Sequence, residues 1–306
     1  MRAIEPTHSG YATNPHDGVR SFYEVFGPVD ARRTLVMVPS WSLVHSRVWK
    51  MQVPFFARHG MRVVIFDGRG NGASDKPDHG YAAEDFGRDT VAVMDAAGVE
   101  RAVLVGFSAG GRWATHVAVD HPERVERMVL IGPSVYLQGL VRLPLEAFLS
   151  SPPDREGWNK YNAVHWRDDY RDFTGWFAEQ VFSEPHSTKG IDDIVDWSGG
   201  TTPETLIRTV VEGLTPRMRE MWQRLTCPVL IIHGSDDRVA PLANSHALQA
   251  ALPHAELIVI DGGGHAPHLR DPVKVNLILR SYLEREAHGV TRPEVADRPE
   301  VADVVG

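Results

Sequence analysis

A serine in a glycine-flanked turn is the residue best suited to do chemistry in this chain. The run AVLVGFSAGG at positions 102–111 reads as a strand that turns sharply into a helix, with Ser108 at the tip in the spacing Gly-x-Ser-x-Gly. Such a turn projects the hydroxyl above a sheet, and the helix N-terminus beneath it favours developing negative charge. A five-residue pattern of this kind also arises by chance. Here an apolar strand precedes the pattern and a helical stretch follows it, which favours Ser108 as a nucleophile over a structural turn serine.

The general base and its carboxylate follow later in the chain. A serine hydroxyl is a weak nucleophile near neutral pH and needs a base, usually a histidine that a carboxylate orients. The run PVLIIHGSDDRV at 228–239 is a strand leading to paired aspartates, and LIVIDGGGH at 257–265 is a strand leading through glycines to His265. The order Ser, Asp, His is the one expected after a strand-to-helix elbow. We therefore predict Ser108 as the nucleophile and His265 as the base, with Asp236 or Asp237 as the acid.

Two other histidines compete with His265 for a catalytic role. His268 comes three residues later, where we expect the start of the last helix, and it would either pack there or line the pocket. His233 ends a strand, where a hydrogen-bonded structural histidine is more common than a catalytic one. The position of His265 directly after the glycine turn favours it as the base. No metal-ligand spacing links the three histidines, so the sequence predicts neither a metal nor an organic cofactor.

These loops need a sheet to bring them together, and short runs rich in Val, Leu and Ile supply its strands. Runs that are apolar throughout suit strands buried on both faces, as in a mostly parallel sheet flanked by helices. Helices are expected to begin at Pro241 and at Asp271-Pro272, where Asp can cap the first turn and Pro suits its first position. The sequence thus predicts an α/β fold. The predicted strands are 21–26, 34–38, 62–66, 101–105, 127–131, 229–232 and 256–260.

The alternation of strands and helices breaks between residues 134 and 216. We find no convincing buried strand there, and predict a helical cap, 134–216, inserted into a core made of residues 1–133 and 217–288. The hexamer RPEVAD occurs twice in succession at 292–303, and such a charged, proline-containing repeat cannot bury a core, so residues 289–306 are expected to be a disordered tail. Nine aromatics crowd the insertion: Trp158, Tyr161, Trp166, Tyr170, Phe173, Trp176, Phe177, Phe182 and Trp197.

Composition limits the classes of partner. The 306 residues carry a net charge of −8, and their Lys and Arg residues are scattered, which gives no basic surface for nucleic acid. No apolar run approaches the roughly 20 residues that span a bilayer, and the first residues lack the apolar stretch of a signal peptide. The single cysteine, Cys227, precedes a strand and is expected to be a buried thiol. We expect a cytoplasmic protein that acts on a small molecule, without a membrane or nucleic-acid partner; the sequence leaves its oligomeric state open.

Taken together, these motifs resemble the α/β-hydrolase superfamily, in particular its cap-bearing serine hydrolases of the esterase-like and carbon–carbon-hydrolase-like kinds. The likeness covers roughly residues 20 to 286 and includes FDGRGNGASD at 66–75, which is similar to the family's Asp-x-Arg-Gly-x-Gly-x-Ser turn. The resemblance implies an α/β-hydrolase fold, and it implies Asp237, the third residue after Gly234, as the acid of the triad. Asp67 and Arg69 are expected to brace their loop, whose glycine spacing differs from that of a dinucleotide-binding loop.

The expected oxyanion loop departs from the family pattern. Most relatives carry His-Gly after the first central strand, whereas this chain carries Pro39-Ser40 followed by Trp41. The resemblance implies the backbone N–H groups of Trp41 and Ala109 as oxyanion donors. A bulky indole beside the nucleophile would narrow the site.

The resemblance further implies a serine hydrolase that cleaves a carboxylic ester or related acyl bond through an acyl-enzyme. The aromatic-rich cap favours a small, largely apolar substrate. A carbon–carbon hydrolase of the diketone type would keep the same triad, and a non-catalytic ligand receptor could use the same scaffold, so both alternatives stay open. The residues expected to line the substrate pocket are Ser40, Phe107, Trp158, Trp166, Trp176 and His268.

Overall fold

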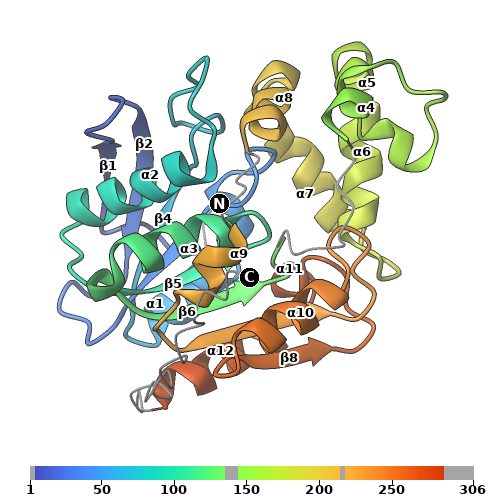
Figure 1. Ribbon diagram of the computed structural model, residues 1–306. Coiled ribbons are helices and arrows are strands. Elements are labelled where there is room, and N and C mark those ends of the chain that lie inside the picture. Colours follow the sequence, from blue (N-terminus) through green and yellow to red (C-terminus); the bar gives the residue numbers. More distant parts are fainter. Residues whose placement is uncertain (1–3, 135–143, 214–217, 286–306) are drawn as a thin grey trace, which may run out of the picture.

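An eight-stranded sheet forms the centre of the molecule, with its strands in the order β1-β2-β4-β3-β5-β6-β7-β8. The computed structural model describes residues 4–134, 144–213 and 218–285. Figure 1 shows the sheet crossing the molecule, with helices around it. The strands are β1 (His8–Thr13), β2 (Arg20–Phe26), β3 (Thr34–Val38), β4 (Arg62–Phe66), β5 (Ala102–Phe107), β6 (Val125–Ile131), β7 (Val229–Gly234) and β8 (Glu256–Ile260).

The sheet is mostly parallel, as the sequence predicts. Neighbouring strands from β4 to β8 run parallel, whereas β1 and β2 pair antiparallel at one edge. The predicted limits hold for β3, β4 and β8. Strand β6 begins at Val125 rather than Arg127, because Val125 still pairs with Ala102 of β5 although the residues around it are less apolar. This sheet order brings the loops after β3, β5, β7 and β8 to one edge.

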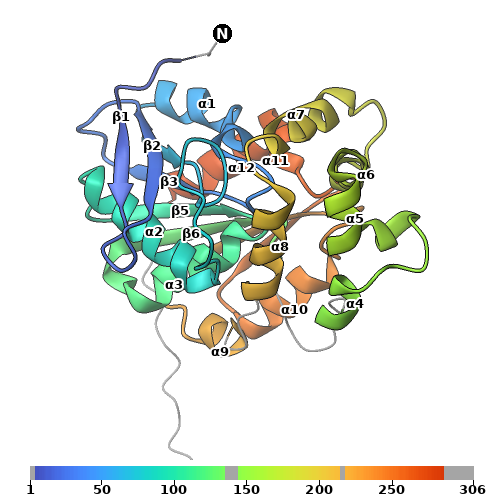
Figure 2. The same ribbon diagram turned by 90° about the horizontal axis from the view of Figure 1, so that it is seen from above.

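Two hydrophobic cores lie on the two faces of the sheet. Along β5, Leu104 packs into one core, and Val103 and Val105 pack into the other. This alternation explains why the strand is apolar throughout, since both of its faces are covered. Figure 2 shows the helices on either side. The first face is covered by α2 (Ala83–Ala96), α3 (Gly110–Asp120), α9 (Met218–Gln223) and α10 (Ala243–Ala251), and the second by α1 (Gln52–Arg58) and α12 (Pro272–Glu284).

The last helix, α12, starts where the sequence predicts. Asp271 is its N-cap residue and accepts a hydrogen bond from the Lys274 N–H, while Pro272 occupies the first helical position. Helix α10 begins at Ala243 instead of the expected Pro241. The reason is that Pro241 lies in the turn before the helix, where its carbonyl accepts the Asn244 N–H at 2.8 Å.

Between β6 and β7 the described residues 144–213 form helices and no strand. These inserted helices stand beside the carboxyl ends of the parallel strands (Figures 1 and 2). Aromatic side chains make up much of their core: the rings of Trp166 and Phe173, both fully buried, stack with centroids 4.4 Å apart. The inserted helices are α4 (Leu145–Leu149), α5 (Ala163–Asp168), α6 (Tyr170–Val181), α7 (Thr188–Ser198) and α8 (Pro203–Glu212).

The structure does not describe residues 135–143, 214–217 and 286–306. The predicted start of the insertion at residue 134 lies beside the first of these ranges, and its predicted end at residue 216 lies within the second. The predicted tail at 289–306 lies within the third. None of the helices in the described ranges combines the length and apolar character that crossing a bilayer requires. The remaining elements are the short helix α11 (Pro267–Arg270) and the 3₁₀ turns Ser46–Trp49, Pro122–Arg124 and Gly157–Lys160.

Candidate active site

The turn between β5 and α3 has the geometry of a nucleophile elbow. Ser108 has a φ of 52°, in the left-handed region that residues other than glycine rarely occupy. Its N–H donates to the Ile131 carbonyl of β6 at 2.9 Å, and its own carbonyl accepts the Gly111 N–H at 3.1 Å. These bonds hold the serine in an unfavourable backbone conformation, and such conformations are concentrated at functional sites.

Two glycines allow the elbow to close. A side chain at Gly106 would meet the Gly110 carbonyl group at 2.7 Å, closer than real Cβ atoms approach. A side chain at Gly110 would overlap the carbonyl oxygen of Pro39, which leads into the loop that contains Trp41. The elbow and the Pro39–Trp41 loop therefore touch through backbone atoms, and their spacing depends on the missing Cβ at position 110.

The aspartate and histidine loops meet at the same edge of the sheet. Asp237 follows β7 and His265 follows β8, and the Nδ1 atom of His265 lies 2.7 Å from Oδ2 of Asp237. The other carboxylate oxygen, Oδ1, accepts hydrogen bonds from the N–H groups of Val239 and Ala240, both at 2.8 Å. Asp236, by contrast, is exposed. The structure thus brings Asp237 and not Asp236 to the histidine.

Asp237 is buried and yet keeps its negative charge. Burial alone would raise the pKa of its carboxyl, but the charge of His265 and hydrogen bonds from His233 and His265 outweigh burial and hold the pKa of Asp237 well below its usual value. An ionised carboxylate beside Nδ1 of His265 keeps a proton on that nitrogen. The other ring nitrogen, Nε2, is then the one that can accept a proton.

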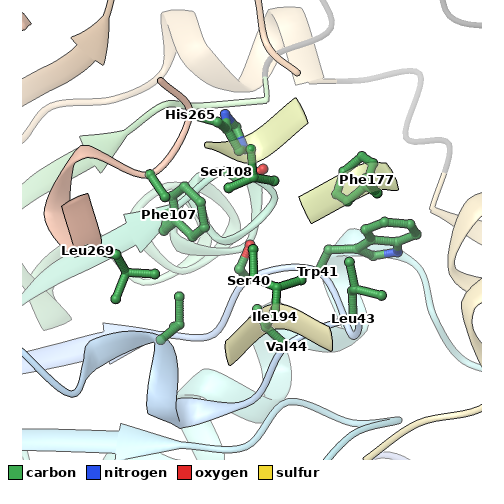
Figure 3. A pocket seen from close by; sticks show the side chains of 13 residues that line it. Ser40, Trp41, Leu43, Val44, Phe107, Ser108, Phe177, Ile194, His265 and Leu269 are labelled. Atoms are coloured by element: carbon green, nitrogen blue, oxygen red, sulfur yellow. The ribbon is translucent and has the colours of Figure 1, made fainter. Parts of the chain in front are cut away.

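Ser108 and His265 line the same cavity, which has a volume of about 40 Å³. Figure 3 shows their side chains at one end of it, with Phe107 and Leu269 on one side and Trp41 and Phe177 on the other. Nearly all of the remaining wall is aliphatic or aromatic. The lining residues are Ser40, Trp41, Leu43, Val44, Val48, Phe107, Ser108, Phe177, Val181, Ile194, His265, Ala266 and Leu269.

The Pro39–Trp41 loop reaches the cavity beside Ser108. Within the part of the chain that the structure describes, the backbone N–H groups of Trp41 and Ala109 make no hydrogen bond to another backbone group. The indole of Trp41 extends toward the inserted helices, where its Nε1 donates to Thr209 Oγ1 at 2.6 Å and its ring lies 5.5 Å from that of Phe177. Trp41 therefore both walls the cavity and anchors the loop to the insertion.

The turn at residues 66–75 is hydrogen-bonded to the segment that directly follows the Pro39–Trp41 loop. Asp67 Oδ1 accepts the Ser46 N–H at 3.0 Å. The Arg69 carbonyl accepts the Ser42 hydroxyl at 2.9 Å, and its guanidinium donates to Asp89 at 2.6 Å. Within the turn itself, Asp67 Oδ2 accepts the Ala73 N–H at 2.9 Å, and Arg69 ties the turn to α2 through Asp89, so the bracing role predicted for these two residues is confirmed.

Two of the six residues expected to line the pocket, Ser40 and Phe107, do so. The three tryptophans lie elsewhere, which corrects the expectation. Trp166 is buried in the core of the inserted helices, and Trp158 is half exposed with its ring 5.1 Å from that of Trp176. Aromatic rings in a small helical unit pack on each other, so their number did not reveal which of them face the cavity. Aliphatic residues without any distinctive pattern, such as those contributed by the loop after β3, form the wall instead.

His268 also lies outside the cavity wall, and it sits in α11 rather than at the start of α12. Its ring is fully buried between those of Trp49 and Phe107, with centroid distances of 5.0 and 4.5 Å. Burial, with a further contribution from the charge of His265, lowers the pKa of His268 to about 3. The imidazole is therefore neutral at physiological pH.

This burial makes His268 a source of acid sensitivity. Below about pH 6.5 the unfolded chain binds a proton at His268 that the folded chain does not, so the free energy of unfolding falls by about 1.4 kcal/mol per pH unit from this group, down to its folded pKa of about 3. The His268→Phe variant keeps a ring at the position and removes the titration. We expect urea unfolding to show a steeper loss of stability between pH 7 and pH 5 for the wild type than for His268→Phe; parallel losses would contradict this.

Comparison with known proteins agrees with this fold. The model of the Alpha/beta hydrolase family matches residues 35–276. A non-heme chloroperoxidase of Streptomyces lividans is 30% identical over 303 residues, covering 91% of this chain and 94% of its own length, and a bifunctional esterase/perhydrolase of Acinetobacter calcoaceticus is 28% identical over 288 residues, covering 90% and 99%. The structure of an esterase from Exiguobacterium antarcticum, 20% identical, has the same fold, with a TM-score of 0.79 over 91% of this chain and 100% of its own. The chain therefore belongs to the alpha/beta hydrolase family.

Proposed function

We propose that the protein is a serine hydrolase that cleaves small carboxylic esters with a short apolar acyl group through an acyl-enzyme. The observation that carries this proposal is the 2.7 Å contact between His265 Nδ1 and Asp237 Oδ2, with His265 and Ser108 lining one apolar cavity. A histidine held by a buried carboxylate is a general base able to activate a serine hydroxyl. The family and an esterase activity named among the relatives support the same reaction.

In the first half-reaction Ser108 Oγ attacks the ester carbonyl carbon while its proton passes to His265 Nε2. Asp237 stabilises the imidazolium that results. The carbonyl oxygen becomes an oxyanion that accepts hydrogen bonds from the N–H groups of Trp41 and Ala109, where the loss of one donor typically costs about 3 kcal/mol. The intermediate collapses, His265 gives its proton to the leaving oxygen, and the alcohol departs.

In the second half-reaction water takes the place of the alcohol. His265 accepts a proton as the water oxygen attacks the acyl carbon, and the same N–H groups hold the second oxyanion. Collapse of that intermediate breaks the bond to Ser108 Oγ, which recovers its proton from His265. The products are the free acid and the unchanged enzyme.

The size and lining of the cavity favour a short apolar acyl group. A space of about 40 Å³ exceeds the roughly 10–15 Å³ that a single ordered water needs, but it is small for an extended chain. Its aliphatic wall includes Leu43, Val44 and Ile194, which offer no partner for a charged group. Acetyl to butyryl groups meet both conditions.

Leu269 is expected to limit the length of the acyl group. It lines this cavity and also a second one, of about 230 Å³, that lies next to it. We expect Leu269→Ala to join the two and to raise kcat/KM for an octanoyl ester relative to an acetyl ester about tenfold. Leu269→Met, which keeps the volume of the side chain, is the matched control. Steady-state kinetics with both esters measures this ratio, and an unchanged ratio in Leu269→Ala would count against Leu269 as the wall.

The distance between the Pro39–Trp41 loop and Ser108 is expected to depend on Gly110. The methyl group of Gly110→Ala must push the Pro39–Trp41 loop away from Ser108, so we expect kcat to fall about tenfold or more. Gly111→Ala is the matched control, because its methyl group would meet the Leu130 side chain at 3.3 Å, a contact that a small shift relieves. Equal activity of the two purified variants in an ester assay would contradict the expectation.

The relatives also point to hydrogen peroxide as an alternative acyl acceptor. One of them is named an esterase/perhydrolase and another a chloroperoxidase. Attack of peroxide in place of water on the acylated Ser108 would release a peracid by the same proton transfers. A peroxide-dependent peracid product, lost in Ser108→Ala, would support this second activity.

A substrate panel tests the proposed reaction against the open alternatives. We expect the purified protein to hydrolyse aryl acetate and butyrate faster than aryl octanoate. Cleavage of a ring-derived diketone, without ester hydrolysis, would replace the proposal by carbon–carbon bond hydrolysis. A folded protein that turns over neither class would favour the ligand receptor.

A further inference from the structure

A second histidine, His233, lies on the far side of the triad carboxylate. It is the penultimate residue of β7, it is completely buried, and its Nε2 atom lies 3.1 Å from Asp237 Oδ2. That is the same oxygen that His265 Nδ1 contacts from the other side at 2.7 Å. The carboxylate is therefore held between two imidazoles.

The partners of His233 fix where its proton sits. Its Nε2 atom also lies 2.7 Å from the Ala240 carbonyl oxygen, and neither a carbonyl nor an ionised carboxylate can donate a hydrogen bond. Nε2 must therefore carry the hydrogen. In the neutral ring Nδ1 is then an acceptor, and the Ser245 hydroxyl, buried and 2.6 Å away, donates to it.

The same contacts close a ring of hydrogen bonds around the aspartate loop. The Ala240 N–H donates to Asp237 Oδ1, and the Ala240 carbonyl accepts from His233 Nε2. His233 thus contacts the loop at two points, which are the Asp237 carboxylate and the backbone carbonyl of Ala240, three residues later. Because the carboxylate oxygen that it holds is the one facing His265, the orientation of the base depends on it.

We propose that His233 is a positioning residue of the active site: its Nε2–H, fixed on that nitrogen by the Ala240 carbonyl and the Asp237 carboxylate, holds this carboxylate in the orientation that directs His265 toward Ser108. The inference rests on the proposed function, since it concerns how that triad is held. His233 touches neither the substrate nor the reacting atoms, so it acts through Asp237 and not as a catalytic residue.

Substitution of His233 separates positioning from mere packing. His233→Leu fills the site but has no donor, and we expect kcat for an aryl acetate to fall about tenfold or more with KM unchanged, because a misaligned base slows chemistry and not binding. His233→Gln can place an amide N–H near the position of Nε2 and is expected to recover most of the lost kcat. Ile231→Val, on the same strand and in the core on the same face, is the matched control for destabilisation without loss of the donor.

The outcomes are distinct. A folded His233→Leu with a kcat within twofold of the wild type, or a His233→Gln as impaired as His233→Leu, would overturn the inference. If His233→Leu does not fold, His233→Phe decides, since it keeps an aromatic ring and has no donor; a lower kcat with an unchanged KM is expected, and a wild-type kcat would overturn the inference. If the wild-type protein hydrolyses no ester, the proposed function is wrong. If the wild type is active and His233→Leu has the same kcat, only the role of His233 is wrong.

Discussion

Ser108→Ala is expected to lower kcat for a short-chain aryl ester by about 10⁴-fold or more. The change removes the one oxygen that forms the covalent bond and leaves the rest of the cavity in place. Alanine is no harder to hold at a φ of 52° than serine, and the backbone bonds to Ile131 and from Gly111 do not involve the side chain. The loss should therefore appear in kcat, with the thermal unfolding midpoint close to that of the wild type.

A buried serine far from the site provides the control for this variant. Ser21 lies in β2 near the antiparallel edge of the sheet, and its hydroxyl has no hydrogen-bond partner within the described part of the chain. Ser21→Ala therefore removes a hydroxyl at little cost, and we expect full activity. Residual hydrolysis by Ser108→Ala within tenfold of the wild type would mean that another group attacks the ester.

Asp237→Asn is expected to reduce kcat about 10⁴-fold, as the loss of the charged acid does in serine proteases. The reason lies in the four N–H groups around this carboxylate, from His265, His233, Val239 and Ala240. An amide in either orientation turns its own N–H₂ toward donors. If it faces His265, the ring must accept at Nδ1 and carry its proton on Nε2, which removes the base.

The neighbouring Asp236→Asn variant provides the matched control. Asp236 is exposed and bonds to Ser235, so we expect its kcat to stay within twofold of the wild type. Steady-state kinetics of the two variants, with circular dichroism to verify folding, makes the comparison. A loss in Asp236→Asn and not in Asp237→Asn would reverse the assignment of the acid.

The fold was predictable because its signals are local. A strand covered on both faces is apolar throughout, as β5 is, and the loops after β5, β7 and β8 are marked by glycine or aspartate. The start of α12 at Pro272 was predictable for the same reason, since Asp271 caps it. The start of β6 was less predictable, because its backbone pairing with β5 extends beyond the apolar run of residues.

The cavity wall and the network behind the triad could not be predicted in the same way. Which rings of the insertion face the substrate depends on how they pack on each other, as Trp166 and Phe173 do, and no periodicity encodes that choice. His233 was expected to be a hydrogen-bonded structural histidine, and its bonds to Ser245 and Ala240 confirm this. Its contact with Asp237 arises from the turn after β7, which brings positions four residues apart together.

The most direct test of the account is covalent labelling by a fluorophosphonate, which reacts with an activated serine hydroxyl. After digestion and mass spectrometry of the wild type, we predict the label on the peptide that contains Ser108. Labelling should be absent in Ser108→Ala and weak in His265→Ala, because the hydroxyl needs its base. A folded, unlabelled wild type, or a label on a different residue, would contradict the claim that Ser108 is the nucleophile.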